Sequence, residues 1–62
     1  MNTTPRAILA LSVLATVDML GACSFDRLVG IFGSFELGRV VAGLRESGLL
    51  EMTGSGLYVV AD

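Results

Sequence analysis

Few side chains in this 62-residue chain could carry out chemistry, because it has no histidine and a single cysteine, Cys23. Histidine acid–base catalysis is excluded, and neither a phosphate-binding loop nor a nucleophile paired with a base is present. The carboxylates are scattered: Glu36 and Glu46, on one predicted helix, lie roughly three turns apart at ~3.6 residues per turn. We therefore expect no enzyme activity, no catalytic residues, no cofactor and no small-molecule substrate. A lone cysteine also allows no disulfide within the chain and no cysteine-based metal site, and we interpret Cys23 as a small buried thiol.

Anion binding is the chemistry that remains, and it rests on four arginines, Arg6, Arg27, Arg39 and Arg45. Contact between cationic side chains and phosphate supplies most of the non-specific affinity for DNA. The six acidic residues outnumber the arginines, there is no lysine, and the net charge is -2. An acidic chain can still bind DNA if its arginines gather on one face, so the elements that position them decide the question.

The first predicted element is a helix from Pro5 to Leu20. Thr4 is a suitable N-cap, proline is tolerated at the first helical position, and Gly21 with Ala22 ends the helix. Its side chains are apolar on nearly every side, which is typical of a helix that is buried on most sides. Two interpretations stay open: a central core helix, or a core helix that also forms a dimer seam.

A second helix is predicted from Phe25 to Phe32, with Ser24 as its cap and Asp26 in the first turn, where a carboxylate suits the helix dipole. Four apolar residues recur at the spacing of one helix face. They are Phe25, Leu28, Val29 and Phe32. Arg27 is expected to face outward, and Gly33 is expected to end the helix and permit a tight turn.

A third helix is predicted from Phe35 to Ser47, with Ser34 as its cap. Its apolar stripe consists of Leu37, Val40, Val41 and Leu44. Gly48 is placed to take the left-handed conformation that follows a helix. The expected outward positions are Glu36, Gly38, Arg39, Ala42, Gly43, Arg45 and Glu46. Arg39 and Arg45 do not share one side of this helix, and its small outward residues would let another surface approach closely.

The rest of the chain predicts a hairpin, with strands at 49–52 and 57–61 joined by a turn at 53–56. The glycines of the turn can adopt positive φ without steric cost. Tyr58 and Val60 share one strand face and Leu57 and Val59 the other. One of these pairs is expected to pack on the helices, and the other is expected to form an exposed apolar surface.

This order of elements resembles the winged helix-turn-helix domains of small bacterial and phage transcription regulators. Those domains commonly show a leucine, a few polar residues, Gly-Leu-hydrophobic, a turn, and then Gly-x-Tyr-x-hydrophobic. The matching stretches here are Leu44-Arg-Glu-Ser-Gly-Leu-Leu-Glu51 and Gly56-Leu-Tyr-Val-Val60. The resemblance covers nearly the whole chain from Pro5 onward. It implies an α+β fold in which residues 1–62 form a single winged helix-turn-helix domain, three helices followed by a two-stranded β-hairpin.

The resemblance also implies DNA binding, with the helix at 35–47 in the major groove. The implied DNA-binding residues are Arg27, Ser34, Phe35, Arg39, Arg45, Thr53 and Ser55. Arg39 and Arg45 would reach guanine edges or phosphates, and Arg27 would brace a phosphate. Ser34 or Phe35 would approach the DNA backbone where free helix amides favour an anion.

The sequence departs from the family at the wing tip, where Thr53 and Ser55 stand in place of the basic residues that the family often uses. Glu36 and Glu46 flank the helix arginines, so the alternative for Arg39 and Arg45 is a solvated arginine with a carboxylate nearby. A second function is therefore kept open: a protein-interaction module, adaptor or inhibitor, on a winged-helix frame with little or no DNA binding. In either case we expect a homodimer or a protein partner bound through the first helix or the wing.

A last alternative concerns the start of the chain. Arg6 precedes an apolar run, and Leu20-Gly21-Ala22-Cys23 resembles the lipobox of a bacterial lipoprotein signal. Asp18 argues against this interpretation, because a charge there is unfavourable in a membrane. Cleavage would also remove the helix that completes the core. The run is shorter than the ~20 residues of a membrane span, so we expect a cytoplasmic protein that does not enter the membrane.

Overall fold

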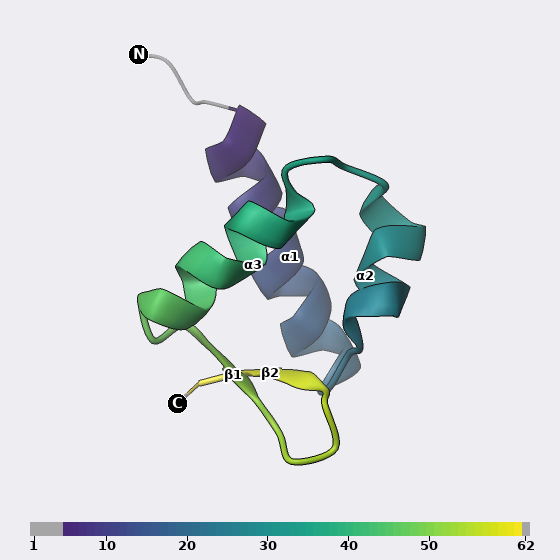
Figure 1. Cartoon of the computed structure of the whole chain (residues 1–62), viewed down its shortest axis with the longest axis vertical. Helices are drawn as coiled ribbons and strands as arrows, with labels where there is room; N and C mark the ends of the chain where they lie inside the picture. The colour runs from purple at the N-terminus through teal and green to yellow at the C-terminus, as the bar shows by residue number, and fades with distance from the viewer. Residues whose placement is uncertain (1–4, 62) are drawn as a thin grey trace.

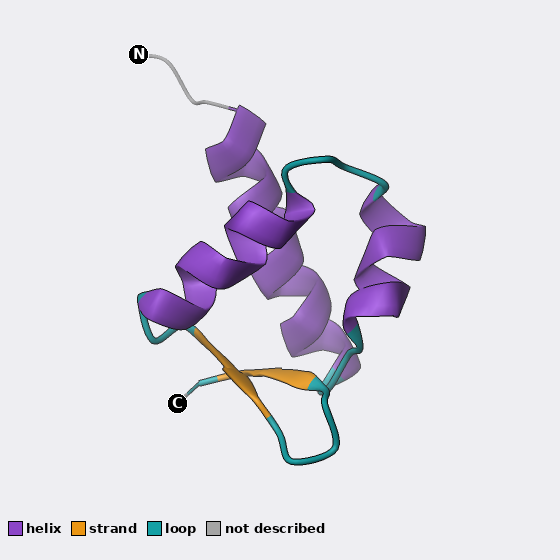
Figure 2. Cartoon of the chain, in the orientation of Figure 1, coloured by secondary structure: helices purple, strands orange, loops and turns teal. Residues whose placement is uncertain are grey.

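The computed structural model describes residues 5–61 and confirms the predicted α+β layout of three helices followed by an antiparallel hairpin. The helices are α1 (Pro5–Leu20), α2 (Phe25–Phe32) and α3 (Leu37–Glu46), and the strands are β1 (Leu50–Met52) and β2 (Tyr58–Val60). In the view of Figure 1, α3 crosses in front of α1, α2 stands beside them, and the hairpin runs below the helices. Figure 2 shows the same arrangement by type of element. The predicted cap at Thr4 lies outside the described residues.

The first two helices have the predicted bounds, and α2 also has the predicted caps. The Ser24 hydroxyl accepts a hydrogen bond from the Arg27 amide at 3.1 Å, and Asp26 lies in the first turn. Gly33 takes a left-handed φ of 60° and donates to the Val29 carbonyl at 2.8 Å. Such a conformation is open to glycine at no steric cost, so the chain can turn sharply toward α3.

The third helix is shorter than predicted at both ends. It begins at Leu37 rather than Phe35, because the Ser34 hydroxyl and carbonyl bond the amides of Glu36 and Leu37 in a tight turn ahead of the helix. The prediction that Ser34 is the helix cap is therefore wrong, since the cap position is held by Glu36 without a side-chain bond. At the other end Gly48 has the predicted left-handed φ, 79°.

Apolar side chains from all three helices and both strands form one core. The buried residues are Val13, Val17, Cys23, Leu28, Leu37, Val40, Val41, Leu44, Leu50 and Tyr58. The predicted stripe of α3 and the buried thiol of Cys23 are confirmed. On α2 the prediction is wrong in part: Leu28 is buried and Phe32 packs at the core edge, whereas Phe25 and Val29 are exposed. The reason is that α2 is covered mainly by α3, so only part of its apolar face meets another element.

The hairpin pairs Leu50 with Val60 and Met52 with Tyr58, so both strands are slightly shorter than predicted. Tyr58 is buried and Val60 packs against the core, so theirs is the face of β2 that meets the helices. The pair on the other face, Leu57 and Val59, is half-buried, so the prediction that the second pair forms an exposed surface is wrong in part.

The other edge of β2 is paired as well, which the sequence did not predict. The amide of Cys23 donates to the Tyr58 carbonyl at 3.0 Å, and the Tyr58 amide donates to the Cys23 carbonyl at 2.7 Å. The linker between α1 and α2 thus acts as a one-residue third strand. An unpaired edge in so short a sheet would leave backbone N–H and C=O groups without hydrogen-bond partners, and this bridge provides partners for two of them on β2.

Candidate nucleic-acid interface

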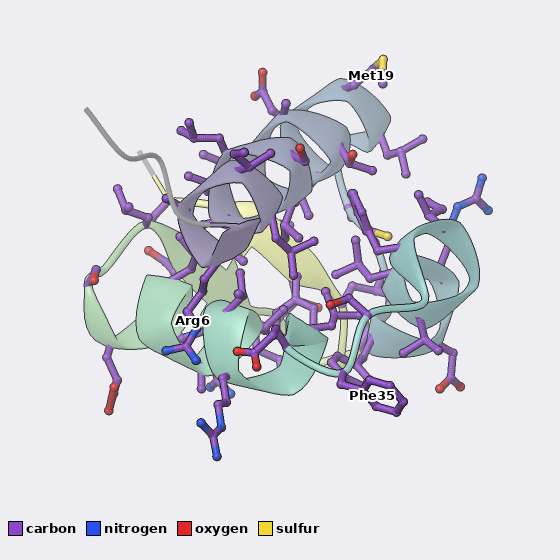
Figure 3. All side chains as sticks on the ribbon, turned by 90° about the horizontal axis from the view of Figure 1, so that it is seen from above. Arg6, Met19 and Phe35 are labelled. Carbon is purple, nitrogen blue, oxygen red and sulfur yellow. The ribbon has the colours of Figure 1, made fainter. Side chains whose placement is uncertain are left out.

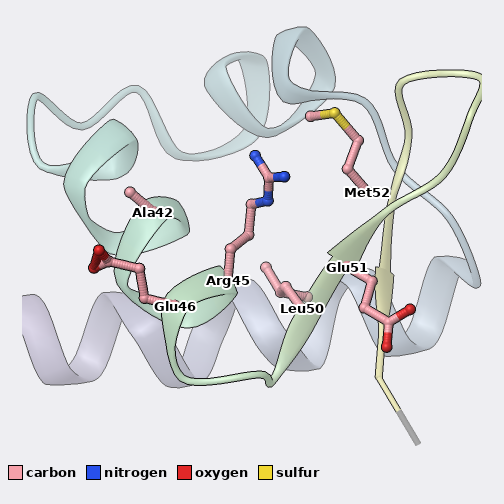
Figure 4. A pocket seen from close by; sticks show the side chains of 6 residues that line it. All are labelled: Ala42, Arg45, Glu46, Leu50, Glu51 and Met52. Atoms are coloured by element: carbon pink, nitrogen blue, oxygen red, sulfur yellow. The ribbon is translucent and has the colours of Figure 1, made fainter.

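A hollow of about 610 Å³ lies between the C-terminal half of α3 and β1. It is lined by Ala42, Arg45, Glu46, Leu50, Glu51 and Met52. Figure 4 shows the Arg45 side chain extending into this hollow, whereas the carboxylates of Glu46 and Glu51 point away from it. One cation therefore stands between a helix and a hairpin, and no carboxylate of residues 5–61 is bonded to it.

Arg39 lines a different surface, a groove of about 420 Å³ between α1 and α3. This α1–α3 groove is bordered by Arg6, Ala7 and Ala10 of α1 and by Arg39, Gly43 and Leu44 of α3, among others. The structure therefore keeps Arg39 and Arg45 on different flanks of α3, as their spacing predicts. Arg27 is exposed on α2, so the predicted arginines do not gather into one cluster.

Glu36, one of the two carboxylates predicted to lie near the helix arginines, is paired with a different arginine. Glu36 accepts a hydrogen bond from Arg6 Nε at 2.8 Å, and Arg6 Nη2 lies 2.7 Å from the same carboxylate oxygen, Oε2. Within residues 5–61 no other side-chain ion pair forms, so Arg27, Arg39 and Arg45 are unpaired in that part of the chain. These guanidinium groups need not break an internal salt bridge before they bind an anion.

The N-terminal end of α3 is less suited to an anion than predicted. The amides of Glu36 and Leu37 are already bonded to Ser34, at 3.1 and 3.2 Å. Ser34 is half-buried and its hydroxyl belongs to the turn. Phe35, by contrast, is 105% exposed and points away from the fold, as Figure 3 shows. Its ring is free to contact a partner surface.

Of the two residues predicted to contact DNA at the hairpin tip, one has its side chain engaged in the turn and the other is exposed. The Thr53 hydroxyl accepts hydrogen bonds from the Ser55 amide at 3.3 Å and from the Leu57 amide at 3.2 Å, so it closes the turn. Ser55 is exposed. Because both side chains are neutral, the tip offers a hydroxyl at most to a phosphate or a groove edge.

The outer face of α1 carries a second candidate surface. Ile8, Leu11 and Met19 are 53%, 67% and 79% exposed, and Ala15 lies between them on the same face. Met19 extends into solvent at the end of the helix (Figure 3). We call these four residues the α1 stripe. Exposed apolar stripes of this kind are typical of protein interfaces.

Among residues 5–61 no group of three or more histidine, cysteine or acidic side chains is arranged to hold a metal ion. None of the helices in that range has both the length and the apolar character of a membrane span. Comparisons of the chain with models of protein families, with curated proteins and with solved structures found no match.

Proposed function

We propose that this chain is a small DNA-binding transcription regulator of the winged helix-turn-helix type, with α3 in the major groove and the hairpin as the wing. The observation that carries the proposal is the open hollow between α3 and β1, into which Arg45 extends without an ion pair within the described residues. A helix flanked by a hairpin presents two convex elements that can straddle a strand of duplex DNA. A guanidinium between them can donate to a phosphate or to a guanine edge.

The charges around this surface limit the affinity of one domain. Arg27, Arg39 and Arg45 supply at most three cationic contacts, while Glu46 and Glu51 line the hollow beside Arg45. Each phosphate neutralised contributes about 0.9 to the slope of log affinity against log salt concentration, so a single domain should bind weakly and with a shallow slope. Two linked domains would raise the effective affinity without any new contact.

The α1 stripe is the surface that we propose for pairing two copies. Its apolar residues lie on the face of α1 away from Val13 and Val17, which are buried in the core. Pairing through α1 therefore leaves the hollow between α3 and β1 of each copy accessible. A homodimer of this kind would present two α3 helices to two half-sites, as dimeric helix-turn-helix proteins do.

The proposal is tested by measuring binding to a mixed pool of fluorescent DNA duplexes over a range of salt concentrations. We expect affinity that falls with salt in the native protein, with the summed slope of two paired domains, and a smaller slope, by about one unit per domain, in Arg45→Gln and in Arg39→Gln. Glu51→Gln is a control of opposite sign, because it removes a carboxylate from the hollow and should strengthen binding. Absence of binding at low salt, or equal binding by all four proteins, would refute DNA recognition by this surface.

A second function is supported by a separate observation. The α1 stripe and Phe35 leave apolar side chains in solvent, which favours a protein-interaction module on the same frame. The same salt series separates the two functions, since a module of this type would show no salt-dependent binding to any duplex.

A further inference from the structure

We propose that the α1–α3 groove is a docking site for a segment of a partner protein that carries a carboxylate next to aliphatic side chains. This site is separate from the hollow beside Arg45, and the proposal does not depend on DNA binding. It rests on the shape of the groove, its floor and the two arginines at its edge.

Between its two arginines the groove is lined mostly by apolar residues, several of them small. Ala7 and Ala10 from α1 and Gly43 and Leu44 from α3 line it, and its volume is about 420 Å³. A Cβ atom built on Gly43 would meet no atom within 4 Å, so this part of the floor is open. Small side chains on both walls let a polypeptide approach the two helices closely, and its aliphatic groups would be removed from water there.

The charge at the groove selects the partner. Arg6 and Arg39, one from each helix, both line the groove, and among the described residues no acidic one belongs to the lining, although Glu36 is bonded to Arg6 at its mouth. The hollow beside Arg45, by contrast, has Glu46 and Glu51 in its lining, so it is less favourable to a carboxylate even though their own carboxylates point away from it. In a chain with a net charge of -2 the α1–α3 groove is thus the hollow suited to an acidic segment.

The contact with Glu36 holds the Arg6 side chain in place and leaves some of its N–H groups free to bind a ligand. Figure 3 shows Arg6 lying between α1 and α3. Its Nε and Nη2 face a single carboxylate oxygen of Glu36. A guanidinium has five N–H donors, so donors remain for a second acceptor while the contact with Glu36 limits the motion of the side chain. Arg39, which forms no ion pair within residues 5–61, supplies the uncompensated charge.

The floor also argues for a protein segment over a nucleic acid. Phosphate and sugar would leave the apolar floor in contact with polar groups, whereas a peptide with alternating acidic and aliphatic side chains matches both parts of the groove. A carboxylate bound by an arginine through charge-assisted hydrogen bonds would fix the orientation of that peptide.

The test is a selection of short random peptides displayed on phage against the native chain, followed by titration of the selected peptides as synthetic, end-capped molecules. We expect the selected sequences to be enriched in aspartate or glutamate beside leucine, isoleucine or valine. Replacing their acidic residues by the matching amides should weaken binding about tenfold or more, as expected for the loss of a hydrogen bond to a charged group.

Two pairs of matched variants locate the binding site. Gly43→Leu fills the groove and should abolish peptide binding, whereas Gly38→Leu, on the same helix and equally open but outside the groove lining, should retain it. Arg39→Gln should weaken binding about tenfold, whereas Arg45→Gln should not change it. Circular dichroism establishes that each variant is folded.

Three results would overturn the proposal: selection of no peptide, selection without acidic enrichment, or equal binding by Gly43→Leu and Gly38→Leu. Of the variants in the DNA titration, Arg39→Gln alters the groove lining, whereas Arg45→Gln and Glu51→Gln do not, so the DNA result is judged on these two. Failure of the docking proposal is therefore distinguishable from failure of the proposed regulator function.

Discussion

Arg6, in the first turn of α1, holds Glu36, the residue that precedes α3, through a hydrogen bond of 2.8 Å from Nε and a 2.7 Å contact from Nη2. The pair joins residues far apart in sequence and fixes the start of α3 against the start of α1. Both side chains are about half exposed, at 55% and 44%, so water screens the attraction. The contact defines geometry at the mouth of the α1–α3 groove more than it stabilises the fold.

Removal of either partner should therefore have a small effect on stability. We expect Arg6→Gln and Glu36→Gln each to lower the free energy of unfolding by about 1 kcal/mol or less, as exposed ion pairs do. Urea denaturation of the single variants and of the double variant measures the coupling between them. A loss as large as that of a buried leucine would show that the contact has a structural role beyond its exposed geometry.

Truncation of two neighbouring residues of α2 should change the stability of the protein by very different amounts. Leu28 is fully buried and is the buried residue of α2, whereas Val29 is 44% exposed. Leu28→Ala should destabilise the protein by about 2–5 kcal/mol, because it leaves a cavity in the core. In a domain this small we expect that loss to abolish folding. Val29→Ala should change stability by about 0.5 kcal/mol or less, and thermal melts of the two variants would contradict this packing if they coincided.

Two glycines should also respond oppositely to alanine. Gly48 ends α3 with a φ of 79°, and its amide and that of Leu49 bond the carbonyls of Arg45 and Leu44. Gly48→Ala should cost about 1–2 kcal/mol, because a Cβ is disfavoured in that conformation. Gly30 lies inside α2 with open space around it, so Gly30→Ala should stabilise the protein by about 0.5–1 kcal/mol. Chemical denaturation gives both values, and destabilisation by Gly30→Ala would contradict the open space around this residue.

Self-association through the α1 stripe should be sensitive to polarity at its centre. Leu11→Gln replaces a side chain that is 67% exposed, so the folded monomer should survive while the proposed dimer dissociates at higher protein concentration than the native one. The expected change in the dimer dissociation constant is about tenfold, from the loss of roughly 1–2 kcal/mol of apolar burial. Sedimentation equilibrium measures it. Phe35→Gln, which removes an exposed ring outside α1, is the control and should leave the dissociation constant unchanged.

Most of the local structure could be predicted from the sequence, because the ends of the helices are set by hydrogen bonds between residues close together in the chain. Ser24 and Gly33 bound α2 through hydrogen bonds to residues three or four positions away, and their identities alone indicate both ends. Ser34 misled for a related reason: its hydroxyl does bond a nearby amide, that of Glu36, but in a turn and not in the helix. A serine that caps a helix and a serine in the turn before a helix differ in position by only a residue or two, and residue propensities do not distinguish such small shifts.

Features that depend on how the helices and strands pack could not be predicted from the sequence. The spacing of Phe25 and Val29 shows that they share a face with Leu28, but whether that face is covered depends on where the other helices lie. The partner of Glu36 could not be found either, because Arg6 reaches it across the fold and no local spacing links them. The opposite flanks of Arg39 and Arg45 were predictable from helical geometry, while the groove that Arg39 shares with Arg6 required the packing of α1 on α3.

The double hydrogen bond between Cys23 and Tyr58 ties a linker in the first half of the chain to the last strand. Tyr58 also belongs to the core that the three helices share. A chain cut before the strand at 58–60 would lose Tyr58 from the core and both hydrogen bonds to the linker at Cys23. We therefore expect the closing of the interior to wait for the last strand, so that a truncated chain is more sensitive to proteases than the whole one.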